Sequence, residues 1–242
     1  APVNPLRSLL FVPATRPARF ANASASGADA IIIDLEDAVP SPEKDRARAT
    51  AMTALESPGA AGVLRCLRIN SPRTADGLRD LLALADGVGL PDALVVPKVE
   101  SPDELRLIAD VLGARGAEVS LLPLVETARA LSVADQIAAH PRVQALVFGG
   151  ADLAADLGAA MAWEPLLYAR SRLVQAAATA GRAALDVPYL DLAQNDGLAD
   201  ESDNCPDGDN ADQADLDSDG LGDACDDDAD GDGYESEDSG GD

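Results

Sequence analysis

Seven short runs of Val, Ile and Leu recur along residues 1 to 192, each followed by a polar turn and then by an Ala, Leu and Arg stretch with helical spacing. This order is typical of strands that alternate with helices in a parallel sheet. The runs are apolar throughout, which indicates that both faces of the sheet are buried, as in a barrel or a doubly wound sheet. The expected strands of this α/β fold are Ser8–Pro13, Ala30–Leu35, Val63–Ile69, Ala93–Pro97, Val119–Val125, Ala145–Phe148 and Ala184–Tyr189.

The acidic side chains are distributed unevenly, and the change divides the chain near residue 193. Residues 193 to 242 hold 20 of the 43 acidic side chains and no Lys or Arg, so this tail carries almost all of the formal net charge of -25. Such a tail repels nucleic acid and anionic membranes and attracts multivalent cations. No apolar run reaches the roughly 18 residues of a membrane span. We therefore expect two domains, residues 1–192 and 193–242, and neither a nucleic-acid nor a membrane partner.

Charged and polar residues stand where the expected strands end. In a βα barrel the carboxyl ends of all strands face one pocket, whereas a doubly wound sheet gathers only those near its switch point. Any one acidic residue here could simply cap the following helix. Their recurrence favours a functional site instead, built from Asp34, Glu36, Asp37, Arg68, Asn70, Lys98, Glu100, Glu126 and Asp152.

The residue types in this set indicate a hard metal ion and an anionic substrate. Glu126 and Asp152 follow adjacent strands, and two carboxylates with few other ligands suit Mg²⁺, which keeps several waters. Arg68 offers a planar fork for a substrate carboxylate. The single histidine, His140, precedes Pro141 at an expected helix end and is interpreted as structural, which argues against a zinc site. A carboxylate clamp beside a metal suits a 2-oxo or 3-hydroxy acid.

Residues 6 to 192 also contain a series of motifs that resemble the citrate lyase beta subunit and malyl-CoA lyase family, of the HpcH/HpaI aldolase-like kind. The motifs occur in order and at matching spacing. They are Ser8–Pro13 (SLLFVP), Arg16–Phe20 (RPARF), Gly27–Val39 (GADAIIIDLEDAV), Leu67–Asn70 (LRIN), Val96–Glu100 (VPKVE), Pro123–Thr127 (PLVET) and Phe148–Leu153 (FGGADL).

The resemblance implies a TIM (βα)8-type barrel that uses magnesium to cleave or form a carbon–carbon bond between an acyl-CoA thioester and an oxo acid. The implied substrate is of the citryl-CoA, malyl-CoA or citramalyl-CoA type, and the implied assembly is a homo-oligomer. Carried over to this sequence, Glu126 and Asp152 would hold the metal. Arg68 would act with Glu36 and Asp37 as catalytic groups, and Arg16, Arg68 and Glu126 would contact the substrate or coenzyme.

The family pattern continues past the seventh strand into a further helix, an eighth strand and a C-terminal helical segment. This sequence leaves that pattern between about residues 191 and 198. We therefore expect an incomplete barrel of about seven strands. The alternative to a lyase is a chimeric or extracellular calcium-binding protein whose partial barrel is not catalytic.

In the tail, aspartates alternate along the chain ahead of glycines. Asp215, Asp217 and Asp219 precede Gly220, and a similar series precedes Gly233. Alternating carboxylates before a glycine turn can curl around one Ca²⁺ ion, although the flanking helices of an EF-hand are absent. The composition by itself would fit a disordered, solubilising tail. The spacing favours calcium loops, with candidate ligands Asp215, Asp217, Asp219, Asp223, Asp226, Asp228, Asp230 and Asp232.

The segments Asp203–Pro206, Asn210–Gln213 and Gly222–Asp226 resemble the thrombospondin type 3 repeat, over about residues 195 to 235. The resemblance implies an irregular, calcium-dependent module with almost no hydrophobic core and a disulfide, for which Cys205 and Cys225 are the candidates. A disulfide persists in an oxidising compartment, which favours a secreted or cell-surface protein. The lack of a visible export signal favours the cytoplasm, and we take that as the primary expectation.

Overall fold

Seven parallel strands form one sheet, and their order in space follows their order in the sequence. The computed structural model describes residues 6–188, 204–205, 214–218, 220–222 and 225–226. Every expected strand is present, although the seventh is short, and Tyr189 of its expected range lies outside the described residues. The strands are β1 Leu9–Pro13, β2 Ala30–Asp34, β3 Leu64–Arg68, β4 Ala93–Val96, β5 Ser120–Val125, β6 Ala145–Phe148 and β7 Ala183–Leu185.

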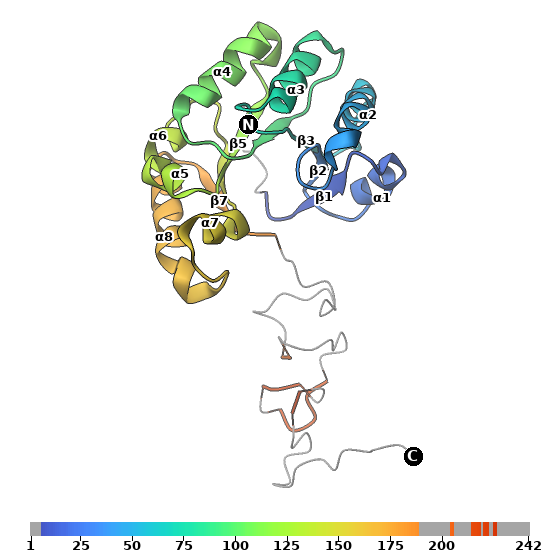
Figure 1. Cartoon of the computed structure of the whole chain (residues 1–242). Coiled ribbons are helices and arrows are strands. Elements are labelled where there is room, and N and C mark those ends of the chain that lie inside the picture. The colour runs from blue at the N-terminus through green and yellow to red at the C-terminus, as the bar shows by residue number, and fades with distance from the viewer. Residues whose placement is uncertain (1–5, 189–203, 206–213, 219, 223–224, 227–242) are drawn as a thin grey trace. The chain divides into compact units, whose positions relative to one another are not determined.

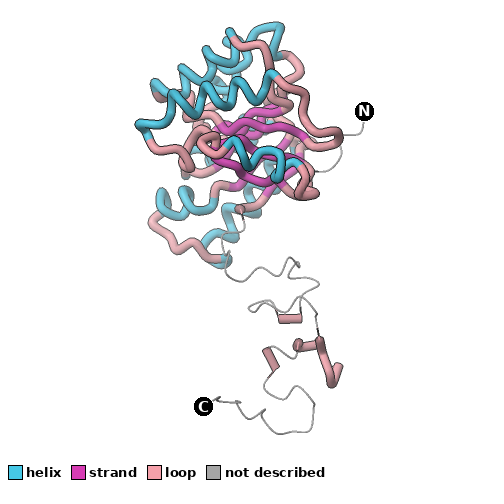
Figure 2. The backbone as a smooth tube through the Cα atoms, turned by 90° about the vertical axis from the view of Figure 1, so that its right-hand side faces the viewer, coloured by secondary structure: helices cyan, strands magenta, loops and turns pink. Residues whose placement is uncertain are grey.

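Helices follow the strands and cover the outer face of the sheet (Figures 1 and 2). Several begin at a hydroxyl cap; Thr74 and Thr127, for example, each accept a hydrogen bond from a backbone N–H three residues later. In the described part of the chain no helix is both long and apolar enough to cross a bilayer. The helices are η1 Pro17–Arg19, α1 Phe20–Ser24, η2 Ser41–Glu43, α2 Lys44–Glu56, α3 Ala75–Asp86, α4 Pro102–Leu112, η3 Gly113–Gly116, α5 Ala128–Ser132, α6 Ala134–Ala138, α7 Gly150–Leu157 and α8 Trp163–Thr179.

The strands are apolar throughout because both of their faces are buried. One face packs against the helices, and among the described residues the other face is filled by strand and loop residues. Along β2, Ile33 belongs to the outer cluster, which lies between the sheet and the helices, and Ile32 belongs to the inner cluster on the opposite face. The inner cluster consists of Ala30, Ile32, Cys66, Ala93, Val95, Leu122, Leu124 and Ala145.

The order of the strands distinguishes a barrel from a doubly wound sheet. A doubly wound sheet reverses its strand order at a switch point, but here each strand pairs with the next from β1 to β7. Among the described residues β1 pairs only with β2 and β7 only with β6, so the two edge strands do not close on each other. Within the described residues, the prediction of an α/β barrel with about seven strands that does not close is confirmed; the calcium-dependent tail stays a prediction.

The chain divides into two compact units, Ala1–Val187 and Pro188–Asp242. The first contains the barrel. In the second, a disulfide joins Cys205 to Cys225, with an S–S distance of 2.07 Å, and the N–H of Gly222 donates to the carbonyl of Asn204 at 2.9 Å. These contacts link two segments of the tail that are 20 residues apart.

Candidate active site

Strand alternation turns three charged side chains toward the inner face at the carboxyl ends of the strands. Successive residues of a strand point to opposite faces. Asp34 is therefore on the same face as Ile32, Arg68 on the face of Cys66, and Glu126 on the face of Leu124; all three of these apolar residues belong to the inner cluster. The barrel thus places charged groups above its apolar interior, from strands far apart in sequence.

Asp34 and Arg68 form the most buried charge pair of this group. They are register partners on β2 and β3. Nε of Arg68 donates to Oδ1 of Asp34 and Nη2 donates to Oδ2, both at 2.7 Å. The Arg68 guanidinium also lies 5.0 Å from the ring centroid of Phe11. Despite burial, the carboxylates around Arg68, Asp34 foremost, raise its pKa above the usual range. The fork is fixed, with only Nη1 directed elsewhere.

Glu36 receives the remaining nitrogen of Arg68. Its Oε2 lies 3.1 Å from Nη1, and Oδ2 of the exposed Asp37 lies 3.4 Å from the same nitrogen. The loop that carries Glu36 is held by Lys44, whose ammonium donates to the carbonyls of Leu35 and Glu36 at 2.7 and 2.6 Å. Burial, opposed by Arg68, raises the pKa of Glu36 to about 7.

Glu126 is buried at the end of β5 and is 4% exposed. Its Oε1 accepts a hydrogen bond from the backbone N–H of Lys98 at 2.6 Å. Gly149 leaves the room that this carboxylate needs, because a Cβ there would lie 2.4 Å from Cβ and 2.7 Å from Oε2 of Glu126. Burial, reinforced by the nearby Glu36, raises the pKa of Glu126 to about 7.

Lys98 places its ammonium between carboxylates that follow different strands. Nζ lies 3.1 Å from Oδ2 of Asp152, in the first turn of α7, and 3.6 Å from Oε1 of Glu36. The backbone of Lys98 has φ 53°, a left-handed conformation that costs a residue with a side chain about 1 kcal/mol. Glu36, Glu126 and Asp152 therefore surround one residue that is already a cation.

This arrangement fits a divalent cation held by Glu126 and Asp152. The Lys98 ammonium, paired with Asp152 and Glu36, shows that positive charge is favourable beside these carboxylates. In the described part of the chain no three His, Cys, Asp or Glu side chains lie close enough to ligate an ion together. A hard cation such as Mg²⁺ accepts one or two carboxylates and completes its shell with water or substrate oxygen.

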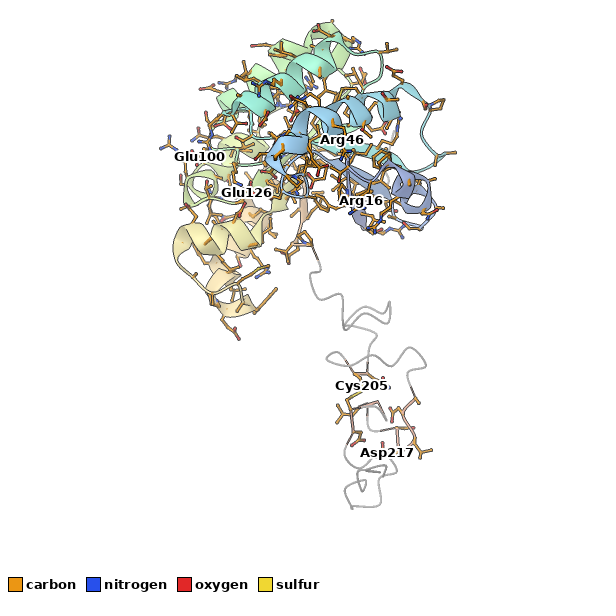
Figure 3. All side chains as sticks on the ribbon, turned by 45° about the vertical axis from the view of Figure 1, so that its right-hand side comes forward. Arg16, Arg46, Glu100, Glu126, Cys205 and Asp217 are labelled. Atoms are coloured by element: carbon orange, nitrogen blue, oxygen red, sulfur yellow. A yellow bond between two sulfur atoms is a disulfide. The ribbon has the colours of Figure 1, made fainter. Side chains whose placement is uncertain are left out.

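The other residues proposed from the sequence lie at different distances from this cluster. Asn70 faces away from it, since its side chain and its N–H both donate to Asp80 at 2.8 Å. Glu100 pairs with Arg73. Arg16 is exposed in the turn after β1, and no described contact joins its side chain to the cluster; Figure 3 labels it and Glu126.

Two residues have a larger part in the site than their sequence pattern indicates. The pattern marks Asp34 only as an acid at a strand end, but Asp34 fixes Arg68 and also accepts hydrogen bonds from the N–H groups of Glu36 and Ala38. The signal for this is that Asp34 ends one strand and Arg68 ends the strand beside it. The pattern places Lys98 at a strand end without a role, and its positive φ has no clear sequence signal.

Other candidate residues lie outside this cluster or outside the described residues. His140 is buried after α6, and its Nδ1 accepts a hydrogen bond from the N–H of Arg142 at 3.3 Å, which fits a structural histidine. Among the proposed calcium ligands, Asp215, Asp217 and Asp226 are described. The others, Asp219, Asp223, Asp228, Asp230 and Asp232, lie outside the described residues.

A βα barrel whose strand ends gather an arginine fork and several carboxylates has the groups that can bind an anionic ligand and a hard cation. Residues 7–208 match the family described as HpcH/HpaI aldolase/citrate lyase, and the chain belongs to that family. The matched range ends beyond Leu192, where the sequence patterns had placed the end of the barrel.

Two relatives illustrate the range of proteins that the chain resembles. It is 34% identical over 215 residues to the mitochondrial citramalyl-CoA lyase of Homo sapiens, covering 82% of this chain and 63% of the relative. It is 38% identical over 155 residues to a (3S)-malyl-CoA thioesterase of Cereibacter sphaeroides, covering 64% of this chain and 52% of the relative. The chain thus spans less than two thirds of the length of these relatives.

Solved structures share the fold. RipC from Yersinia pestis is 41% identical, with a TM-score of 0.67 over 77% of this chain and 78% of that one. The citrate lyase beta subunit from M. tuberculosis, complexed with oxaloacetate and magnesium, is 35% identical, with a TM-score of 0.63 over 76% of this chain and 79% of that one.

Proposed function

We propose that the chain is a magnesium-dependent carbon–carbon lyase that acts on the CoA thioester of a short hydroxy acid, of the citryl-CoA, malyl-CoA or citramalyl-CoA type. The observation that carries this proposal is that carboxylates after three strands meet at Lys98 beside Arg68: Glu36 and Asp152 pair with its ammonium, and Glu126 accepts from its backbone N–H. Membership of the lyase family supports it. So does the binding of oxaloacetate and magnesium by a structural relative.

In this proposal Glu126 and Asp152 hold Mg²⁺, which would supply Lewis acidity at the oxygen that is a hydroxyl in the thioester and a carbonyl in the oxo acid. Arg68 binds the acid's carboxylate through Nη1, the nitrogen that Asp34 does not engage. Because Asp34 and Phe11 hold the guanidinium still, little side-chain entropy is lost when substrate binds. Asp37 and Glu36 keep Nη1 oriented until substrate replaces them.

The experiment that tests this function is a turnover assay with the three thioesters in the presence of Mg²⁺. The assay follows two products separately: the oxo acid, released by carbon–carbon cleavage, and free CoA thiol, released by thioester hydrolysis. We expect oxo acid without an equivalent of free thiol. Release of free thiol without oxo acid would show that the chain is a thioesterase and not a lyase.

Matched variants make the assay specific to the site. Glu126→Gln and Asp152→Asn each remove one charge from the proposed metal ligands and should lower turnover by about 100-fold or more. Asp103→Asn removes a charge from exposed α4 and should leave turnover unchanged. If the wild-type chain produces no oxo acid and no thiol, the alternative of a non-catalytic partial barrel is correct.

We further propose that the tail binds calcium as a thrombospondin type 3-like module, on the strength of its alternating aspartates and of one contact between Asp215 and Gly220. Gly220 has φ 100°, which favours glycine, and its N–H donates to Oδ2 of Asp215 at 3.2 Å. The other carboxylate oxygen, Oδ1, is buried without a hydrogen bond among the described contacts. An acceptor of this kind is suited to a Ca²⁺ ion.

Calorimetric titration of the full chain with Ca²⁺ tests this second function. Heat of binding is expected at a stoichiometry that falls by one site in Asp215→Ala. Asp110→Ala, on the surface of α4, controls for the loss of one carboxylate. A titration without binding heat, with circular dichroism that does not change on addition of calcium, would remove the proposal.

A further inference from the structure

We propose that Lys98 is a built-in counter-cation of the carboxylate site, whose ammonium pairs with the proposed metal ligand Asp152 when no divalent cation is bound and has to release it when one binds. Lys98 thereby sets the affinity of the site for the metal. This inference rests on the proposed metal ligands Glu126 and Asp152, and it assigns a competing function to a residue that lies between them.

The backbone of Lys98 is held in its left-handed conformation from several sides. Its N–H donates to Oε1 of Glu126 at 2.6 Å, and its carbonyl accepts from Nη2 of Arg73 at 3.0 Å. The neighbouring Val99 is fully buried, which prevents the segment from sliding. This strained turn is maintained by contacts, and it directs the side chain over the carboxylates that follow β2 and β6.

The ammonium engages a carboxylate that a divalent ion would need. It lies 3.1 Å from Asp152 and 3.6 Å from Glu36, and Asp152 is one of the two proposed metal ligands. Two cations that share one carboxylate lie close together and repel each other. Binding of a divalent ion therefore requires that the ammonium moves away or remains at an unfavourable distance, and either outcome weakens binding of the metal.

The Lys98 side chain can move without disturbing Glu126. The side chain of Lys98 is 38% exposed, whereas that of Glu36 is only 9% exposed. The flexible four-carbon stem of lysine lets the ammonium swing into water while the backbone N–H keeps its hydrogen bond to Glu126. Lys98 thus contacts the two proposed metal ligands differently: its fixed backbone N–H binds Glu126, and its mobile ammonium pairs with Asp152.

The test measures binding of Mn²⁺, a probe for the same site, to the metal-free full chain without substrate, by electron paramagnetic resonance of the free ion. Lys98→Met removes the charge and keeps the length of the side chain, and it should bind Mn²⁺ about tenfold more tightly than wild type. Lys98→Arg keeps the charge and should retain the wild-type affinity. Arg106→Met, which removes a surface charge from α4, should also match wild type.

A second variant covers the case in which Lys98→Met does not fold. Lys98→Gly also removes the ammonium and adopts a positive φ readily, and it should show the same gain in affinity. Suppose that wild type binds Mn²⁺, that Glu126→Gln does not, and that the folded Lys98→Met or Lys98→Gly variant binds Mn²⁺ no more tightly than wild type. This result would overturn the role of Lys98 and leave the proposed metal site intact. If neither wild type nor these variants bind Mn²⁺, the proposed function and this inference both fail.

Discussion

The guanidinium of Arg68 and the carboxylate of Asp34 meet in a bidentate pair across adjacent strands, with two hydrogen bonds of 2.7 Å. The Asp34 side chain is 1% exposed and that of Arg68 13% exposed. This pair converts a flexible arginine into a fixed fork whose one remaining nitrogen faces Glu36 and Asp37. It couples the folding of the barrel to the geometry of its site.

Replacing Asp34 by Asn should lower the free energy of unfolding by about 3 kcal/mol, because it leaves the buried Arg68 cation without its main partner. Urea unfolding of the metal-free protein measures this change. In the double variant Asp34→Asn/Arg68→Met the loss should be smaller than the sum of the two single losses, since the uncompensated charge is gone. Asp103→Asn, in an exposed pair with Arg106, should change stability by less than about 1 kcal/mol.

Gly149→Ala should damage the site more than the fold. The added Cβ would lie 2.7 Å from Oε2 of Glu126, so the carboxylate has to move. We expect Mn²⁺ affinity to fall by about tenfold or more, with a stability loss of about 1–3 kcal/mol from overpacking.

Gly158→Ala provides the contrast for that variant. Its φ of 64° makes alanine unfavourable by about 1 kcal/mol, but a Cβ there meets nothing within 4 Å. It should therefore lose stability and keep the wild-type affinity for Mn²⁺. If both glycine variants lose metal binding equally, the effect is on the fold and the close approach to Glu126 is irrelevant.

His140 should titrate below the usual range for histidine. Burial, with the nearby Arg142 cation, lowers its pKa from 6.5. Because the chain has 1 histidine, its imidazole proton signals in NMR report this pKa without assignment, and in high urea the pKa should return to about 6.5.

The same shift makes stability depend on pH. A depressed folded-state pKa means that the unfolded chain binds the proton more readily, so His140 stabilises the fold above about pH 6.5 and this contribution is lost as the pH falls through the folded-state pKa. The difference in unfolding free energy between wild type and His140→Asn should therefore shrink between about pH 8 and pH 5. A difference that stays constant would show that His140 is not protonated more easily in the unfolded chain.

The barrel and most of its site could be predicted because they follow from local pattern. Apolar runs marked all seven strands, and strand ends marked Arg68, Glu126 and Asp152. Asp80 could not be found in this way: it lies on α3 with the spacing of an ordinary helix residue, yet it is fully buried and accepts from Nε of Arg48 at 2.6 Å. Its burial depends on the packing of α2 against α3, which is a long-range property.

Lys98 shows a second limit of prediction from sequence. Its position after a strand was visible, but a lysine at a strand end is ordinarily a solvated surface residue. Its importance comes from a left-handed backbone and from carboxylates that follow other strands. The distances between such groups depend on how strands far apart in sequence pair, and the periodicity of a single segment does not contain them.

The thiols of the chain should react in a fixed order. The sequence has 3 cysteines, of which Cys205 and Cys225 form the disulfide and Cys66 is free and buried in β3. Burial raises the pKa of the Cys66 thiol to about 12, so almost no thiolate is present at neutral pH. Titration with an aromatic disulfide reagent should find almost no reactive thiol in the native chain and one reactive thiol after unfolding.

Reduction of the native chain should produce two reactive thiols, those of Cys205 and Cys225. The Cys66→Ala variant should lack the thiol that appears only on unfolding. A thiol that reacts rapidly in the native, unreduced chain would contradict either the disulfide or the burial of β3, and the Cys66→Ala variant distinguishes the two.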